Sequence, residues 1–137
     1  MVFAGISYLA VLVAAVAGFI VGMVWYGILG KRWMVALGKG KAELMPDGKP
    51  PIATMATSFV CALVMAWVLA GLIGHIGAAT VRGGIITAFL VWLGFVATTQ
   101  LINHRYGRFP LSLTIIDAGH WLAVLVVMGA VIGAFGV

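Results

Sequence analysis

Charged side chains are scarce in this sequence. Only 8% of its 137 residues are Asp, Glu, Lys or Arg, and no more than three are acidic. Soluble globular domains carry about 25% charged residues, whereas 64% of this chain is hydrophobic. So little polar surface cannot cover a water-soluble fold of this length. We therefore expect the lipid bilayer to surround the molecule.

Cysteine and the familiar catalytic motifs are also nearly absent. The single cysteine, Cys61, lies within an apolar run, which excludes an intramolecular disulfide and a cysteine metal site. The basic residues fall in connections between apolar runs, which argues against nucleic acid as a partner. The sequence has neither a phosphate-binding glycine loop nor a nucleophile elbow. We expect no cofactor, and we favour a non-enzymatic function over an enzymatic one.

Four long apolar runs fill most of the chain, at about residues 2–29, 52–74, 81–103 and 111–135. A helix needs about 20 residues to cross about 30 Å of hydrocarbon, and each run is long enough. The runs lack the alternation of barrel strands, and a helix satisfies its own backbone groups in lipid. The sequence therefore predicts one domain, an all-α, integral membrane, four-helix bundle.

The basic residues predict how the bundle is oriented. Five of the eight Lys and Arg residues lie in the first connection, residues 30–51, two lie in the third, and Arg82 lies in the second. Basic connections stay in the cytoplasm. We expect residues 30–51 to form a cytoplasmic loop, with its first turns at headgroup level and both termini outside the cytoplasm.

Small residues recur at every fourth position in three of the runs. Such seams let membrane helices approach closely, either within one chain or between chains. In the fourth run the spacing arises by chance as easily as by design. The helix-packing candidates are Ala10, Ala14, Gly18 and Gly22 in the first run, Ser58, Ala62, Ala66, Ala70 and Gly74 in the second, and Gly129 and Gly133 in the fourth.

The polar side chains of the runs gather in the half of the membrane next to residues 30–51. Asp117 is the only acidic residue in a run, about 10 Å below its start, where an unpaired carboxylate is costly. His120 follows three residues later on the same helix face. We expect a shared pocket there, and the candidate site residues are Asp117, His120, Asn103, His104, Gln100, Trp25 and Tyr26.

This polar cluster has two interpretations. It can bind a ligand or handle protons, with Asp117 accepting a hydrogen bond from an imidazole. It can equally be a hydrogen-bond network that fixes the third helix against the fourth. A metal site made by Asp117, His104 and His120 is less favoured because no second motif supports it, so we predict no metal ligand.

Several segments resemble a known family. Residues 22–34 carry Trp25-Tyr26, then Gly27 and Trp33-Met34, and the similarity continues over residues 94–103 and 113–119. Together they resemble the bacterial membrane protein family called domain of unknown function 1761, over nearly the whole chain. The resemblance implies a small four-helix protein of the bacterial inner membrane. It brings no established activity, cofactor or catalytic residue.

Three functions fit these features. The small-residue seams favour an oligomeric or accessory subunit, which assembles with itself or with a larger membrane complex. The polar cluster fits an inward-opening transporter or carrier of a small molecule or protons. It also fits a membrane enzyme that acts on a lipid or quinone-like substrate.

Overall fold

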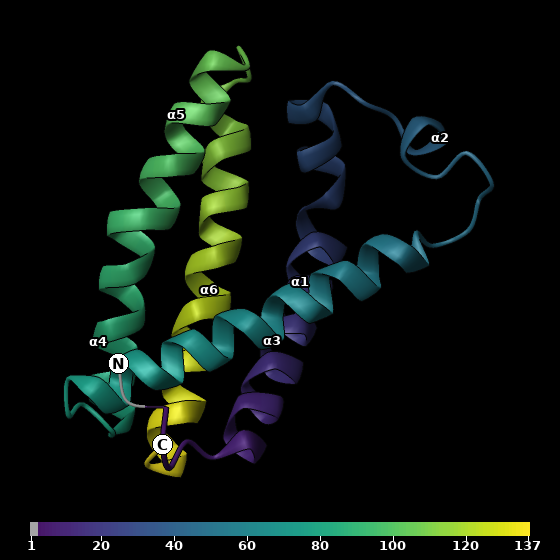
Figure 1. Ribbon diagram of the computed structural model, residues 1–137. Coiled ribbons are helices and arrows are strands. Elements are labelled where there is room, and N and C mark those ends of the chain that lie inside the picture. The colour runs from purple at the N-terminus through teal and green to yellow at the C-terminus, as the bar shows by residue number, and fades with distance from the viewer. Residues whose placement is uncertain (1–2) are drawn as a thin grey trace.

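The computed structural model describes residues 3–137, and the described chain is all-α (Figure 1). Four helices are long and apolar enough to cross a membrane, which confirms the expected four-helix bundle. The third of these contains a π-helical segment, η1. The elements are α1 (Tyr8–Leu37), α2 (Lys41–Leu44), α3 (Ile52–His75), α4 (Val81–Val91), η1 (Trp92–Ala97), α5 (Thr98–Tyr106) and α6 (Leu111–Phe135).

Two capping residues fix where helix α1 begins and ends. The Ser7 hydroxyl accepts a hydrogen bond from the backbone N of Ala10 at 3.2 Å. At the other end Gly38 adopts φ 76° and donates to the last carbonyls of the helix. No proline lies between residue 29 and Gly38, so α1 runs past its expected end at residue 29. The basic segment expected at headgroup level forms its last turns, and the expected start at Val2 lies outside the described residues.

Helix α6 is the centre of the bundle. It contacts α1, α3, α4, η1 and α5. Figure 1 shows α6 beside the α4–α5 helix, with α3 crossing in front of them. The start of α1 and the end of α6 lie together, opposite α2. The buried core fills the half of the bundle nearer these ends, where Ile73, Met128 and Ile132 have no exposed surface.

The seams of α1 and α3 are used inside the chain. Ala10, Ala14, Ala62, Ala66 and Ala70 are all buried in the core between these helices and α6. A Cβ atom on Gly18 would lie 2.6 Å from Cε of Met128. Three members at the seam ends differ, because Ser58 is exposed and Gly22 and Gly74 are only half-buried.

The tightest helix contact joins α4 and α6. A Cβ atom on Gly129 would collide with the carbonyl oxygen of Gly84, and one on Gly133 would collide with the carbonyl oxygen of Thr80. The spacing of Gly129 and Gly133 is therefore a packing motif. Its counterpart, Gly84, was not among the expected packing residues, although Ala88 follows it at the fourth position and also packs on Gly129.

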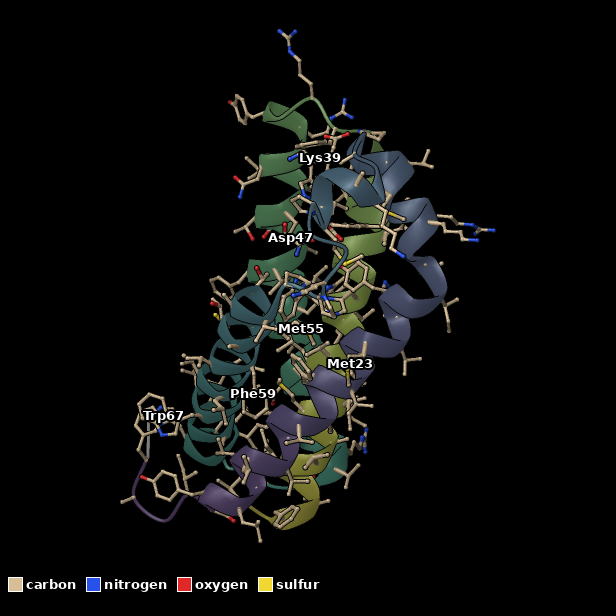
Figure 2. All side chains as sticks on the ribbon, turned by 90° about the vertical axis from the view of Figure 1, so that its right-hand side faces the viewer. Met23, Lys39, Asp47, Met55, Phe59 and Trp67 are labelled. Carbon is tan, nitrogen blue, oxygen red and sulfur yellow. The ribbon has the colours of Figure 1, made fainter. Side chains whose placement is uncertain are left out.

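The helices separate at the α2 end. Figure 1 shows the beginning of α3 leaning away from α5 and the nearby part of α6. In Figure 2, Lys39 and Asp47 mark the connection over this end, and Met23, Met55 and Phe59 lie lower, between α1 and α3. Two connected cavities occupy the space between α1, α3 and α6.

Candidate functional site

Asp117 is held by a hydrogen bond from another helix. The hydroxyl of Tyr26 on α1 donates to Oδ1 of Asp117 on α6, at 2.7 Å. The carboxyl side chain keeps only 19% of its surface exposed. A carboxylate at this depth needs such a donor, because a membrane interior offers little water to solvate it.

His104 approaches the same carboxylate from α5. Its Nε2 lies 3.8 Å from Oδ2 of Asp117, close enough for an ion pair when the imidazole is protonated. Its Nδ1 lies 2.9 Å from the Thr114 hydroxyl, which orients the ring. A polar chain from Thr114 through His104 and Asp117 to Tyr26 thus joins three helices.

Two tryptophans fix the backbone on either side of Asp117. The Trp25 indole donates to the carbonyl of Ile116 at 3.1 Å, and the Trp92 indole donates to the carbonyl of Ala118 at 2.7 Å. Trp25 can reach α6 because Gly119 has no side chain, and a Cβ atom there would lie 2.9 Å from Cζ2 of the indole. These contacts hold Asp117 in one position, as a binding group requires.

The π-helical segment η1 sets how α5 faces α6. A π-helical turn inserts an extra residue into a helix, which rotates everything after it. Thr98 and Thr99 bond back to the carbonyls of Gly94 and Phe95 at 2.9 and 2.6 Å, within this wider segment. Trp92 begins the segment, and Gln100 and His104 follow it on the side of the cavity.

The outer cavity lies beside Asp117 and has a volume of about 750 Å³. Its wall combines aromatic and methionine side chains with a few polar groups. Oε1 of Gln100 is buried and has no hydrogen-bond partner. Its lining includes Tyr26, Trp33, Met34, Lys41, Ser58, Gln100, His104, Asp117 and Trp121.

The inner cavity continues from the outer one toward the core and has a volume of about 330 Å³. Tyr26, Thr54, Ser58 and Trp121 line both cavities. His120 belongs to this inner cavity. It lies beside Tyr26 and Trp121, with ring centroids 4.8 and 4.6 Å apart.

The structure brings most of the expected site residues together but pairs them differently. Asp117 accepts a hydrogen bond from the Tyr26 hydroxyl and not from His120. The phenol ring of Tyr26 packs against the imidazole of His120. Asn103 was expected in the same pocket, yet its side chain is exposed and lines neither cavity. It precedes His104, and successive helical residues point about 100° apart.

The described residues 3–137 contain no group of three or more His, Cys, Asp or Glu residues that could hold a metal ion. The arrangement instead offers hydrogen bonds to a bound molecule.

Sequence reasoning missed Trp92 and Trp121, which touch the site. The available signal was a tryptophan in the middle of a span, where its indole N–H needs an acceptor.

No curated protein and no solved structure matches this chain. One family model matches it over residues 9–133, from the first turn of α1 nearly to the end of α6. The match includes every residue placed above around Asp117 and His120. The chain therefore belongs to the family described as Protein of unknown function (DUF1761).

Proposed function

We propose that this protein binds a small amphipathic molecule in the outer cavity and acts as a membrane-embedded binding protein or carrier. The observation that supports this most is the cavity itself. About 750 Å³ lies within the range of small-molecule sites, roughly 300–1,000 Å³, which are mostly apolar with a few convergent polar groups. Asp117 and His104 are such groups.

The lining suggests how the molecule lies. Lys41 of α2 lines the cavity at its loop end, and Asp117 lines it within the membrane. A polar group of the bound molecule therefore finds partners at Asp117 and Gln100, while Trp33, Met34 and Trp121 cover an apolar part. A closely packed apolar core of alanines and larger aliphatic residues fills the opposite half of the described bundle. This favours a site open to one side over a channel.

The accessory-subunit interpretation stays an alternative, although it has lost its motivating feature. It rested on the small-residue seams, and those of α1 and α3 are covered within the chain. A partner chain would need another surface. The copy number of the protein in lipid nanodiscs distinguishes the two, since the binding function requires one chain only.

Thiol labelling tests whether the outer cavity is open to water. In a Cys61→Ala background, Ser58→Cys places a thiol in the cavity, and the adjacent Thr57→Cys places one outside it at nearly the same depth. We expect a membrane-impermeant maleimide to label Ser58→Cys from the side of residues 38–51, and to leave Thr57→Cys unlabelled. Equal labelling of the two would contradict an open cavity.

Filling the cavity tests binding. We expect a molecule to co-purify with the wild-type protein in nanodiscs, and mass spectrometry of the extract to identify it. Ser58→Trp should abolish its retention because the indole occupies the cavity. Thr57→Trp is the matched control and should retain it. A wild-type protein that retains nothing, or a Ser58→Trp protein that retains as much as the control, would overturn the proposal.

A further inference from the structure

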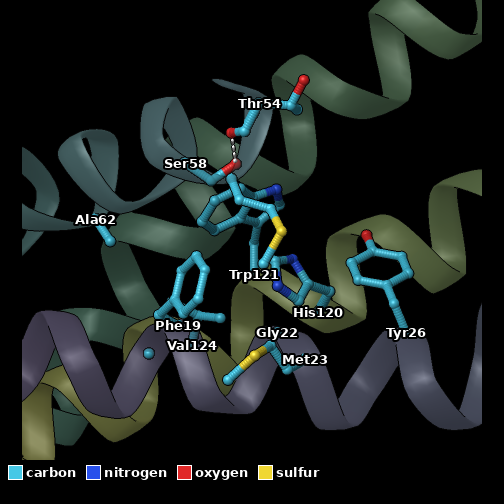
Figure 3. Close-up of a pocket in the computed structure, with 12 residues that line it drawn as sticks. Phe19, Gly22, Met23, Tyr26, Thr54, Ser58, Ala62, His120, Trp121 and Val124 are labelled. Atoms are coloured by element: carbon cyan, nitrogen blue, oxygen red, sulfur yellow. Dashed lines mark hydrogen bonds between the residues drawn. The ribbon is translucent and has the colours of Figure 1, made fainter. Parts of the chain in front are cut away.

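The inner cavity differs from the outer one because its lining is aromatic and uncharged. Figure 3 shows Phe19, Tyr26, His120 and Trp121 around one space. None of the residues that line it is Asp, Glu, Lys or Arg. Rings on several sides leave a slot suited to a flat molecule, because aromatic groups gain by stacking or edge contact. An ionised head would be unpaired in such a space.

Among the described residues that line this slot, His120 is the buried polar group without a hydrogen-bond partner. The residue is only 8% exposed. Its Nδ1 is buried and has no hydrogen-bond partner. Leaving a buried donor or acceptor unpaired costs about 1–3 kcal/mol, and most such atoms in proteins have a partner. The polar chain around Asp117 does not supply one, because Tyr26 and His104 occupy that carboxylate.

Gly22 keeps the imidazole in place. A Cβ atom on Gly22 would lie 3.0 Å from Nε2 of His120, tighter than ordinary contact. The ring is thus confined between α1 and the rings of Tyr26 and Trp121. A side chain held in this way keeps its two ring nitrogens in fixed positions, which is what selective hydrogen bonding requires.

We propose that His120 hydrogen-bonds the ring oxygen of a flat, neutral, membrane-soluble molecule of the quinone or phenol class, seated in the inner cavity. A neutral imidazole can donate to a carbonyl or accept from a hydroxyl, so one anchor serves both forms. The rest of the molecule leaves past Tyr26 and Ser58 into the outer cavity. This inference rests on the proposed binding function and names its ligand class.

Ubiquinone-1 is a suitable probe. Its binding to the purified protein in nanodiscs is measured by equilibrium dialysis against empty nanodiscs, which corrects for partition into lipid. We expect saturable binding to the wild type. His120→Phe keeps a ring but removes the hydrogen bond, and should weaken binding about tenfold. His120→Gln, which can still hydrogen-bond, should bind more tightly than His120→Phe. Equal affinity of wild type and His120→Phe would overturn the proposal.

Two glycine variants test the role of His120 without changing the histidine, in case the histidine variants misfold. Gly22→Ala displaces the imidazole, whereas Gly27→Ala on the same helix adds a methyl group where nothing lies within 4 Å. We expect Gly22→Ala to weaken binding of ubiquinone-1 and Gly27→Ala to leave it unchanged. Equal affinity of these two variants would also refute the role of His120.

Failure of this inference differs from failure of the proposed function. If ubiquinone-1 does not bind the wild type while the maleimide labels Ser58→Cys and a molecule co-purifies, the ligand belongs to another class and the inference is wrong. If Ser58→Cys is not labelled and nothing co-purifies, the proposed function itself is wrong.

Discussion

At the scale of single residues, the carboxylate of Asp117 has a high free-energy cost in a membrane. It lies about 10 Å inside the start of α6, where a lone charge costs several kcal/mol. The Tyr26 hydroxyl at 2.7 Å and the His104 imidazole at 3.8 Å offset that cost. Binding and helix fixation are therefore not exclusive, because the same contacts that orient the carboxylate also tie α1 and α5 to α6.

Removing the Tyr26 hydroxyl should destabilise the bundle. We expect Tyr26→Phe to lower the free energy of unfolding by about 1–2 kcal/mol, since it strands a buried carboxylate oxygen. Tyr106→Phe is the matched control, because Tyr106 is 88% exposed, and such surface changes usually stay within about 0.5 kcal/mol. Thermal unfolding in nanodiscs measures both, and similar losses would show that the contact contributes nothing.

Substitutions of Asp117 itself separate its shape from its charge. Asp117→Asn keeps an oxygen that accepts from Tyr26 and should cost less than about 1 kcal/mol. Asp117→Leu leaves the Tyr26 hydroxyl unpaired and should cost about 1–2 kcal/mol. The same unfolding measurement applies. An Asp117→Asn protein as unstable as Asp117→Leu would indicate that the negative charge, and not the hydrogen bond, is what α1 recognises.

At the scale of elements, glycine decides how closely the helices approach. Lipid is as apolar as the side chains, so membrane helices associate through close backbone contact and dispersion. Gly84 and Gly129 bring α4 and α6 together with no room for a methyl group. The tight contact lies in the half of the bundle opposite α2, which leaves the α2 half free to open around the cavities.

Adding a single methyl group where α4 and α6 cross should lower the free energy of unfolding. Gly84→Ala would collide with the backbone of Gly129, and overpacking of this kind typically costs about 1–3 kcal/mol. Gly94→Ala lies in the same membrane span with nothing within 4 Å, and should be nearly neutral because its methyl group meets no neighbour. Unfolding of the two variants gives the comparison. A Gly84→Ala protein as stable as Gly94→Ala would refute the close crossing.

At the scale of the whole molecule, orientation decides which side supplies the ligand. Lys41, Leu44, Met45 and Pro51 of the connection after α1 line the outer cavity. The start of α1 and the end of α6 lie at the other end of the bundle (Figure 1). Lys31, Arg32 and the lysines of the connection gather at the cavity end. Because basic segments stay in the cytoplasm, we expect the cavities to open inward.

Reporter fusions test this orientation. A green fluorescent protein fused after Val137 should stay dark, because it does not mature when exported, and the same reporter inserted after Asp47 should fluoresce. Alkaline phosphatase at the two positions should give the opposite result and serves as the control. A bright fusion at Val137 would reverse the topology and place the cavity mouth outside.

The linear sequence determined the fold class and the presence of four apolar helices long enough to cross a membrane. These follow from the sequence because each depends on local properties: a run of about 20 apolar residues must cross the bilayer as a helix to satisfy its backbone. The resemblance of residues 22–34 to a membrane protein family likewise needed only the linear sequence, and the family is confirmed.

Only the tertiary structure decided which polar groups meet. Tyr26 and Asp117 are 91 residues apart in the chain, and their contact depends on how far each helix is rotated about its own axis. The Trp25 indole bond to Ile116 fixes the rotation of α1 against α6. The π-helical segment η1 and the Trp92 indole bond to Ala118 fix that of α5. Composition does not specify these rotations. A rotation of one residue, about 100°, separates His104 in the cavity wall from Asn103 on the outer surface.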